Sequence, residues 1–429
     1  MREWSPDTVA RLAGGRLVAR GDVGDGGPQR VSIDSRDVRP GDLFVGIRGE
    51  RADGGAFAVQ ALADRAWGVL VEPPHADALG ADAPGVVIAV DDPVVGLGAL
   101  ARMWRNELAC PVVAITGSVG KTSTKDVLAA MLTQRLRTVA NAQNLNTEIG
   151  LPLTILAAPI GTEALVLEMG MRGGGQIGEL TSIARPDVGV ITAVGPVHLE
   201  LLGTIEAIAS AKAELIAGLA PGKTAVVPAG EPLLAPHLRD DLTTITFGEG
   251  GAVDTLPDGL ELPFASAHMR RNTLAALAAA RAVGVEPHGR LAVALSDRRG
   301  QREALPGDIL VIDDCYNANP MSMRAALDDL AATAHGRRVA VLGDMLELGP
   351  DERRWHREIG EHARASGVDV LVTVGSLAAE MGGDHTTADA AAAAALTKSL
   401  VAPGDTVLIK ASRGVGLEVV AAALRGETE

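Results

Sequence analysis

Aromatic residues and cysteines are scarce in this sequence, and both shortages limit what the chain can be. Phenylalanine, tryptophan and tyrosine make up only 2% of its 429 residues, so its hydrophobic cores must be built from aliphatic side chains. So few aromatic rings also provide no stacking platform for single-stranded nucleic acid. The two cysteines, Cys110 and Cys315, are well separated and match neither a disulfide framework nor a zinc-binding pattern. A reducing compartment is therefore expected.

Positive charge and long apolar runs are scarce as well. The 39 lysines and arginines are outnumbered by 54 acidic residues, which gives a formal net charge of −15. Without a basic cluster, the chain is not expected to bind nucleic acid. No run of residues is long and apolar enough for membrane insertion, and residues 1–6 lack the apolar core of a signal peptide. We therefore expect a cytoplasmic protein.

Strand-like and helix-like segments alternate along the sequence, which divides into three blocks. We expect domains at residues 1–93, 94–300 and 301–429. Hydrophobic residues make up 47% of the chain, and a composition rich in alanine, valine and leucine suits buried parallel strands covered by helices. The first block has predicted strands at 41–47, 67–71 and 85–90, a helix at 55–63 and a turn-rich segment at 73–84.

The second and third blocks alternate more regularly. Strands are predicted at 112–116, 164–168, 188–194, 225–227 and 243–247, then at 309–313, 338–342, 368–374 and 406–411. Helices are predicted between them at 121–132, 176–184, 205–219 and 273–283, then at 322–332, 352–365 and 416–424. Such alternation predicts mostly parallel sheets with helices on both faces. The fold class is therefore α/β with three domains, and the C-terminal one is expected to be Rossmann-like and doubly wound.

A glycine-rich loop lies between the first predicted strand and the first predicted helix of the central block. It reads Gly117-Ser118-Val119-Gly120-Lys121-Thr122-Ser123. In a loop of this kind, backbone N–H groups and the helix start bind phosphate, the lysine reaches the outer phosphates, and the threonine binds magnesium. The alternative is an ordinary glycine turn before a helix. The pattern favours a central sheet of the P-loop type.

Polar residues also follow other predicted strands. Glu168 ends the strand at 164–168, and Asp313 and Asp314 end the first strand of the third block. Because ligands of such sheets bind at the carboxyl ends of the strands, two α/β domains are expected to face each other across a cleft.

The loop departs from the commonest nucleotide-binding pattern, which has a glycine where Ile115 stands. Its shorter form, Thr-Gly-Ser-x-Gly-Lys-Thr-Ser, resembles the ATP loop of the Mur ligases. Segments that resemble the same family follow in its order: 32–36, 40–51, 141–152, 167–170, 195–200, 211–214, 313–323, 341–349 and 410–414. The sequence differs where Gly55 replaces the histidine of Asp-Gly-His, and where Met269-Arg270-Arg271-Asn272 replaces Gly-Arg-His-Asn.

The resemblance implies a role for each matching residue. ATP binding is implied for Gly117, Ser118, Val119, Gly120, Lys121, Thr122, Ser123, Asn272, Arg302, Asp314, Asn317 and Asn319. Substrate binding is implied for Ser35, Arg36, Arg48, Asn144, Asn146, Thr147, Asp344, Lys410 and Arg413. Two Mg²⁺ ions are implied, one at Thr122 and Glu168, the other at His198 and a Lys212 that carries a carbamate. Lys121, Glu168, His198 and Lys212 are the implied catalytic residues.

The activity that the resemblance implies belongs to peptidoglycan precursor synthesis. It is the ATP-dependent joining of D-alanyl-D-alanine to UDP-N-acetylmuramoyl-tripeptide, through an acyl phosphate, by a monomer. Two alternatives stay open: a sister ligase that adds the third amino acid, and a non-catalytic P-loop nucleotide-binding protein. Residues 316–320 and 343–345 argue against the sister ligase, and the presence of Lys121, Glu168 and His198 argues against a protein without activity. Whether the third residue of the tripeptide is lysine or diaminopimelate stays open.

Several of these residues also have plain structural interpretations. Lys212 could be a solvated helix lysine, and Asn319 and Asp344 could cap helices. Cys315 is interpreted as a buried small residue rather than a nucleophile, because no histidine partner accompanies it. His356 could lie near the amine substrate or on an exposed helix face.

Overall fold

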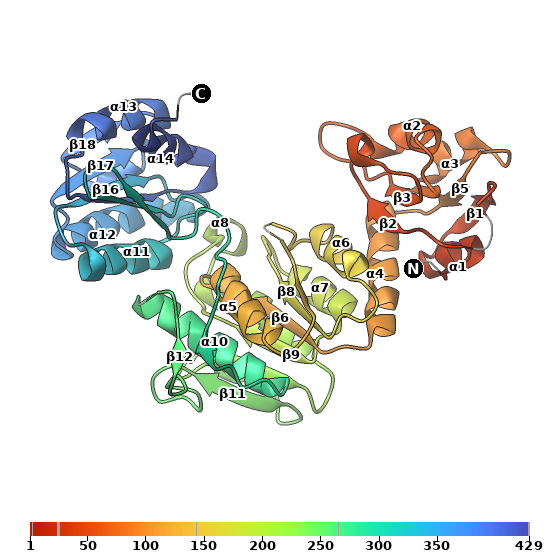
Figure 1. The fold of residues 1–429 in the computed structure, drawn as a ribbon, viewed down its shortest axis with the longest axis horizontal. Coiled ribbons are helices and arrows are strands. Elements are labelled where there is room, and N and C mark those ends of the chain that lie inside the picture. Colours follow the sequence, from red (N-terminus) through yellow and green to blue (C-terminus); the bar gives the residue numbers. More distant parts are fainter. Residues whose placement is uncertain (2, 24–25, 143, 265, 428–429) are drawn as a thin grey trace.

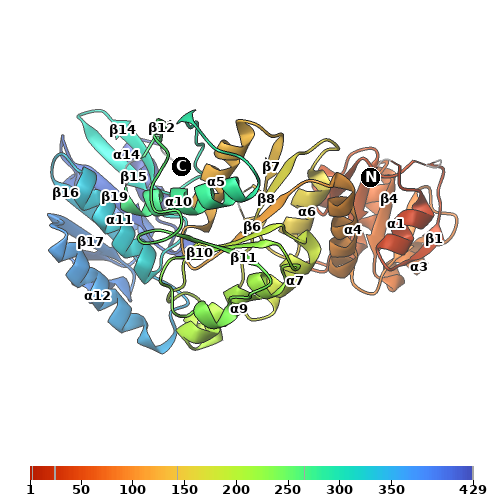
Figure 2. The same ribbon diagram turned by 90° about the horizontal axis from the view of Figure 1, so that it is seen from below.

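Three large β-sheets follow one another along the chain and define an N-terminal, a middle and a C-terminal domain. The computed structural model describes residues 1, 3–23, 26–142, 144–264 and 266–427. The middle domain lies between the other two (Figures 1 and 2). No helix in these ranges is long and apolar enough to cross a membrane.

The N-terminal domain holds a five-stranded sheet in the order β1-β5-β4-β3-β2, in which only β1 runs antiparallel. Its elements are α1 (Pro6–Leu12), β1 (Arg16–Ala19), β2 (Arg30–Ser32), β3 (Asp42–Val45), α2 (Ala58–Ala63), β4 (Gly68–Val71), α3 (Pro73–Leu79) and β5 (Val86–Ala89). The turn-rich prediction for 73–84 was wrong, because residues 73–79 form α3. Its two prolines occupy the first helical turn, where a missing N–H costs no hydrogen bond.

The middle domain holds a six-stranded, all-parallel sheet in the order β11-β10-β9-β6-β8-β7. Its strands are β6 (Val112–Thr116), β7 (Thr138–Ala140), β8 (Ala164–Glu168), β9 (Val188–Ile191), β10 (Thr224–Pro228) and β11 (Thr243–Phe247). Its helices are α5 (Lys121–Thr133), α6 (Gly150–Ala157), α7 (Gln176–Ala184), α8 (Leu199–Leu202), α9 (Ile205–Ala217) and α10 (Ala267–Ala282). A small two-stranded sheet pairs β12 (Leu260–Glu261) with β13 (Gly289–Arg290). The predicted parallel sheet is confirmed, and its inner strand β6 leads into the glycine-rich loop.

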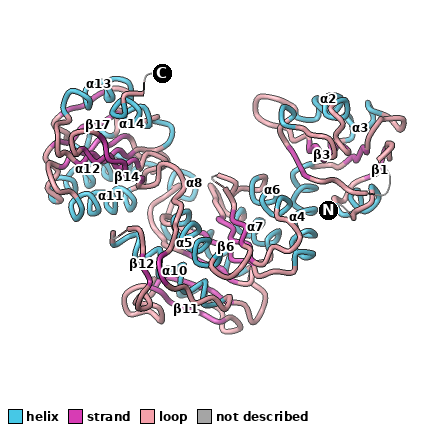
Figure 3. The backbone as a smooth tube through the Cα atoms, viewed as in Figure 1, coloured by secondary structure: helices cyan, strands magenta, loops and turns pink. Residues whose placement is uncertain are grey.

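The C-terminal domain holds a six-stranded sheet in the order β14-β15-β19-β16-β17-β18, in which only β14 runs antiparallel. Its strands are β14 (Gln301–Leu305), β15 (Ile309–Asp313), β16 (Arg338–Gly343), β17 (Val370–Val374), β18 (His385–Thr387) and β19 (Thr406–Lys410). Helices α11 (Pro320–Thr333) and α12 (Glu352–Ala365) cover one face, and α13 (Ala390–Leu400) and α14 (Glu418–Arg425) cover the other (Figures 1 and 3). The predicted doubly wound domain is confirmed.

A long helix, α4 (Pro93–Leu108), joins the N-terminal domain to the middle one. A single buried core continues from Val9 and Leu70, through Leu97 and Trp104 of α4, to Leu151 of the middle domain. Two of the few aromatic rings meet here, where Trp4 packs edge-on against Trp104 with 5.7 Å between ring centroids. By contrast, the two cores of the C-terminal domain contain only residues of that domain. The boundary at residues 93 and 94 stays a prediction.

Candidate active site

Two glycines shape the loop between β6 and α5. Both have positive φ angles, 149° at Gly117 and 84° at Gly120, which residues with a side chain rarely adopt. A Cβ at Gly117 would lie 2.0 Å from Thr192 Oγ1, and a Cβ at Gly120 would lie 2.4 Å from Asn272 Oδ1. The loop therefore requires glycine at both positions, and Asn272 of α10 packs directly against it.

Lys121 and Thr122 open helix α5, as the sequence pattern requires. The Lys121 ammonium donates a 2.8 Å hydrogen bond to the carbonyl oxygen of Gly117, so it folds back over the loop. Burial lowers the pKa of Lys121, and the nearby Glu168 carboxylate opposes this shift. An anionic phosphate in the loop would stabilise the charged form of Lys121 and would accept hydrogen bonds from the N–H groups at the start of the helix.

Three other polar side chains form hydrogen bonds with Glu168, which lies at the end of β8. Its Oε2 accepts a 2.8 Å hydrogen bond from the Thr122 hydroxyl, and its Oε1 accepts one of 2.9 Å from Asn146 Nδ2. Asn141 fixes the backbone of Glu168 through its Nδ2, 3.0 Å from the Glu168 carbonyl, and its Oδ1, 2.8 Å from the Glu168 amide. The structure thus brings together Thr122, Glu168 and Asn146, which lie far apart in the sequence.

A cleft of about 1550 Å³ opens between the middle and C-terminal domains. The predicted residues that line it are Ser118, Val119, Gly120, Lys121, Ser123, Asn144, Asn146, Thr147, Glu168, His198, Asn272, Arg302, Asp314, Asn317, Asn319, Lys410 and Arg413. Gly117, Thr122, Lys212 and Asp344 are not among the lining residues, nor are the predicted residues of the N-terminal domain. The loop and the carboxyl ends of the C-terminal strands therefore face one space.

On the C-terminal side of the cleft, Lys410 is buried at the end of β19. Its ammonium contacts Asp314 Oδ2 at 2.6 Å and donates to the carbonyl oxygen of Asn317 at 3.0 Å. Arg413, in contrast, is exposed, with its guanidinium 5.7 Å from the centre of the Tyr316 ring. Lys410 is therefore held by its own domain, whereas Arg413 can turn toward a ligand.

Three further predicted residues make hydrogen bonds within the C-terminal domain. Asn319 caps α11 in a capping box with Ser322. Arg302 Nη2 donates to Asp329 Oδ2 at 2.6 Å. Asn319 and Arg302 nevertheless line the cleft. Asp344 accepts a 2.6 Å hydrogen bond from the backbone amide of Ala378. The capping interpretation is thus confirmed for Asn319, and the structure does not bring Asp344 to the cleft.

Family comparison assigns the same three segments that carry the sheets. The Mur ligase family catalytic domain matches residues 29–105, the Mur ligase middle domain matches 115–262, and the Mur ligase glutamate ligase domain matches 298–413. The chain belongs to the Mur ligase family. The three-domain architecture is therefore confirmed.

Named relatives of this Mur ligase share most of its length. The UDP-N-acetylmuramoyl-tripeptide–D-alanyl-D-alanine ligase of Synechocystis is 37% identical, with 92% of each chain covered, and that of Bacillus subtilis is 35% identical, with 91% and 92% covered. A crystal structure of MurF from Acinetobacter baumannii has a TM-score of 0.86 at 29% identity over 99% of both chains. MurF from Thermotoga maritima, solved in complex with ADP, has a TM-score of 0.83 at 30% identity, with 93% of this chain and 97% of that one covered.

Lys212 lies deep inside the middle domain of this Mur ligase, on α9. It is 2% exposed, and no hydrogen-bond or ion-pair partner for it is found within the described ranges. Burial and the neighbouring Lys121 push the pKa of Lys212 well below its usual value of 10.5. A buried ammonium without a partner is costly, so burial shifts this lysine toward its neutral form. The interpretation of Lys212 as a solvated lysine was wrong.

His198 lies in the loop after β9, at the N-terminal end of α8. Its Nδ1 is 2.5 Å from Oε2 of Glu347, a residue of the C-terminal domain. Burial lowers the pKa of His198, and the Glu347 carboxylate opposes this shift. His198 therefore takes part in a contact between two domains. Glu347 was not predicted, because its partner is 149 residues away and no local pattern signals the contact.

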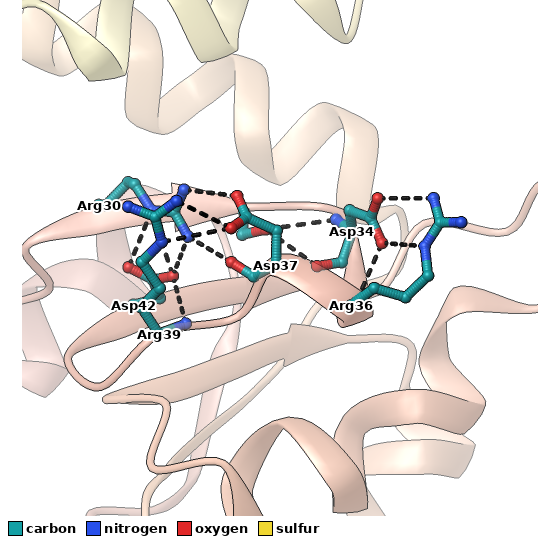
Figure 4. A network of polar contacts seen from close by, with 7 residues as sticks. Arg30, Asp34, Arg36, Asp37, Arg39 and Asp42 are labelled. Carbon is teal, nitrogen blue, oxygen red and sulfur yellow. Dashed lines mark hydrogen bonds and ion pairs between the residues drawn. The ribbon is translucent and has the colours of Figure 1, made fainter.

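The predicted substrate residues of the N-terminal domain form a separate polar region. Figure 4 shows Arg36 turned back onto Asp34, with 2.8 Å between Arg36 Nη2 and Asp34 Oδ2. Arg30 in turn bridges Asp42 and Asp37, which raises the Arg30 pKa. Arg48 contacts Glu72 at 2.8 Å, and Ser35 begins a short 3₁₀ turn. The roles of Ser35, Arg36 and Arg48 stay predictions.

Gly55, where the sequence departs from the family pattern, has an imidazole beside it. A Cβ at Gly55 would lie 2.2 Å from Cδ2 of His75, which comes from α3. His75 Nε2 lies 3.0 Å from Oδ2 of Asp53. Glycine at position 55 thus makes room for a histidine from a different element.

The second departure, Met269-Arg270-Arg271-Asn272, lies at the start of α10. Asn272 and His268 line the cleft, and Arg270 and Arg271 do not. The sequence interpretation missed His268, although a spacing of four residues places it on the same helix face as Asn272. Burial lowers the pKa of His268, and Asp329 and Asp314 of the C-terminal domain oppose this shift.

His356, whose interpretation was open, and Cys315, which was interpreted as a buried small residue, are both buried in the C-terminal domain. His356 is fully buried, with Nδ1 2.7 Å from the Glu352 carbonyl oxygen and Nε2 accepting a 2.9 Å hydrogen bond from the Met345 amide. It thus lies neither on an exposed face nor in the cleft. The Cys315 thiol is buried and donates to Asp313 Oδ1 at 2.8 Å, and burial raises its pKa. Its interpretation as a buried small residue is confirmed.

Proposed function

We propose that this chain is an ATP-dependent ligase that joins D-alanyl-D-alanine to UDP-N-acetylmuramoyl-tripeptide in peptidoglycan precursor synthesis. The observation that carries the proposal is that one cleft contains both the glycine-rich loop with Lys121 and the C-terminal segment from Lys410 to Arg413. A nucleotide bound by the first and a peptide bound by the second would meet there. The relatives named above, which carry this activity in their names, support the same assignment.

The residues present fit the two magnesium ions that the family resemblance implies. Magnesium prefers oxygen ligands, and the hydroxyl of Thr122 and the carboxylate of Glu168 are already in contact. No group of three or more His, Cys, Asp or Glu side chains in the described residues could hold a metal alone, so phosphate oxygens would complete the set. When bound, the ions would neutralise phosphate charge during transfer.

Lys212 fits a second site as a carbamate. The described residues offer its buried amine no hydrogen-bond or ion-pair partner, and burial lowers its pKa, which shifts it toward the neutral form. A neutral amine can attack CO₂ and lose a proton to give an anionic carbamate. With His198, this group would supply ligands for the second ion. A carbamate also removes the repulsion that an ammonium would exert on Lys121 and on a cation.

The chain's own residues would then promote two successive steps. In the first, the carboxylate oxygen of the tripeptide attacks the γ-phosphorus of ATP, and ADP leaves with the bond between the β- and γ-phosphates broken. Lys121 and the loop N–H groups stabilise the charge on the phosphate oxygens. Gly117, Ser118, Val119, Gly120 and Ser123 shape this phosphate site, and Asn272, Arg302, Asp314, Asn317 and Asn319 are assigned to the rest of the nucleotide.

In the second step, the neutral amine of D-alanyl-D-alanine attacks the acyl carbon. The nitrogen of the tetrahedral intermediate loses one proton to solvent, and phosphate leaves as the bond between the acyl carbon and the phosphate oxygen breaks. Arg413, which is exposed at the cleft, is assigned to the dipeptide carboxylate, because a guanidinium binds this group with two parallel hydrogen bonds. Lys410 holds the loop around Asn317 in place. Asn144, Asn146 and Thr147 are assigned to the tripeptide, and Ser35, Arg36 and Arg48 to its UDP end. A monomeric state and a cytoplasmic location stay predictions.

The test is phosphate release from ATP by the purified full chain. We expect release with UDP-N-acetylmuramoyl-tripeptide plus D-alanyl-D-alanine, and comparison of the lysine and diaminopimelate forms of the tripeptide identifies its third residue. Release only with UDP-N-acetylmuramoyl-dipeptide plus a diamino acid would identify the sister ligase. ATP binding without release in either mixture would identify a non-catalytic nucleotide-binding protein.

A further inference from the structure

One loop of the middle domain contacts both the ATP loop and the C-terminal domain. On one side, the Thr192 hydroxyl donates to the Val119 carbonyl at 2.5 Å, and Ser118 Oγ bonds to both the amide and the carbonyl of Gly195, at 2.9 and 3.0 Å. On the other side, a Cβ at Gly195 would lie 2.0 Å from Met321 Sδ of the C-terminal domain. The loop from Thr192 to His198 is therefore packed between the two.

The contact between His198 and Glu347 closes this arrangement. Besides the 2.5 Å approach of His198 Nδ1 to the Glu347 carboxylate, the backbone amide of Glu200 donates to the Glu347 carbonyl at 3.4 Å. Both partners hold left-handed backbone conformations, with φ of 53° at His198 and 65° at Glu347. Such angles are uncommon for residues with side chains and persist where the surroundings impose them, typically at functional sites.

We propose that Glu347 is a positioning residue, which orients His198 across the domain interface and so completes the cleft only when the C-terminal domain is docked. A carboxylate that accepts the Nδ1 proton fixes the tautomer whose Nε2 carries a free lone pair, the form in which an imidazole binds a metal. In the described part of the chain, no hydrogen-bond partner for His198 Nε2 is found, and His198 lines the cleft. The inference rests on the proposed function, in which His198 holds one ion.

The test measures Mn²⁺ affinity of the full chain by electron paramagnetic resonance, with a non-hydrolysable ATP analogue present. We expect Glu347→Ala to weaken Mn²⁺ binding by about tenfold or more, as is typical when the partner of a metal-binding histidine is lost. Glu347→Gln keeps an acceptor oxygen and should recover part of this affinity. The matched control is Glu361→Gln, which removes the same charge from an exposed position of the same domain and should bind Mn²⁺ like the unmodified protein.

A double-mutant cycle shows whether Glu347 acts through His198. In a His198→Ala background, adding Glu347→Ala should have no further effect on Mn²⁺ affinity. A further loss in that background, or an Mn²⁺ affinity of Glu347→Ala equal to that of the unmodified protein, would overturn the positioning role and leave the proposed function intact. An unmodified protein that binds no Mn²⁺ with the nucleotide would overturn both.

Discussion

The hydroxyl of Thr122 donates to the carboxylate of Glu168 at 2.8 Å, although the two residues come from different elements, α5 and β8. The acceptor oxygen that would hold an ion is thus positioned in advance by the loop. Glu168→Gln keeps the shape of the side chain and removes its charge. We expect turnover to fall by about two to three orders of magnitude, because a neutral amide would hold the magnesium ion less well than the carboxylate does. The ion would then stabilise less of the charge on the transferred phosphoryl group.

The Glu168→Gln prediction is checked by the rate of phosphate release at increasing Mg²⁺ concentration. Glu179→Gln, a substitution at an exposed position of α7, is the matched control and should behave like the unmodified protein. Unchanged turnover and Mg²⁺ dependence in Glu168→Gln would remove Glu168 from the proposed metal site.

Lys121→Ala tests the ATP loop. Because the lysine makes one hydrogen bond, to its own loop, its removal should leave the fold intact. Turnover should fall by about two to four orders of magnitude, the scale of a lost charge in the transition state. Phosphate release and thermal melting are measured side by side, with Lys398→Ala, at an exposed position of α13, as the control. A near-normal rate in Lys121→Ala would mean that ATP binds elsewhere.

Lys212→Ala tests the carbamate. The variant should lose activity, and short carboxylic acids should restore part of it, because a small carboxylate can occupy the space that the side chain leaves and supply the missing anionic oxygen. In the unmodified protein, depletion of bicarbonate should lower the rate, and its return should restore it. Full activity in Lys212→Ala would reject any role for this residue.

Binding of both ligands should draw the middle and C-terminal domains together. Each contributes polar strand ends to the same cleft of about 1550 Å³, so a bound ATP analogue and UDP-substrate would favour the more closed arrangement. Small-angle X-ray scattering should give a smaller radius of gyration with both ligands than without them. Identical scattering profiles at saturation would contradict this expectation.

His356 makes the stability of the C-terminal domain depend on pH. Burial holds its pKa below the usual 6.5, so between pH 6.5 and the lower folded value only the unfolded chain takes up the proton. Stability should therefore fall as the pH drops below 6.5. His356→Ala, which leaves the Met345 amide without its hydrogen-bond acceptor, should cost about 1–3 kcal/mol at pH 7.5.

Calorimetric melting at pH 7.5 and 5.5 checks both effects. His335→Gln removes an exposed histidine from the same domain and should melt like the unmodified protein at each pH. His356→Ala should lose less stability between the two pH values than the unmodified protein does. Equal losses would show that another group is responsible for the pH dependence.

The sequence predicted the ATP loop and the inner strands of the three large sheets, because both depend on local patterns, but it missed the edge strands β1, β2, β7, β14 and β18. Strands such as 112–116 and 164–168 are continuous apolar runs, and the loop combines glycines with Lys121 in a fixed spacing. The segment 73–84 was misread, because its two prolines start a helix rather than a turn. Contacts between distant elements could not be predicted, because no local pattern around Gly55 indicates its contact with His75, and none around His198 indicates its contact with Glu347.

The core shared through α4 bears on how such chains can be recombined. A cut near residue 93 would divide one apolar cluster and expose Leu97 and Trp104 to water, so the N-terminal segment cannot be exchanged as a cassette without redesigning its neighbour. The buried cores of the C-terminal segment contain only its own residues, and its contacts with the middle domain include Met321 against Gly195 and Glu347 against His198. Exchange of the C-terminal domain between related enzymes should therefore succeed at the junction near residue 300. Exchange of the N-terminal domain should cost more stability, because it disrupts a shared core.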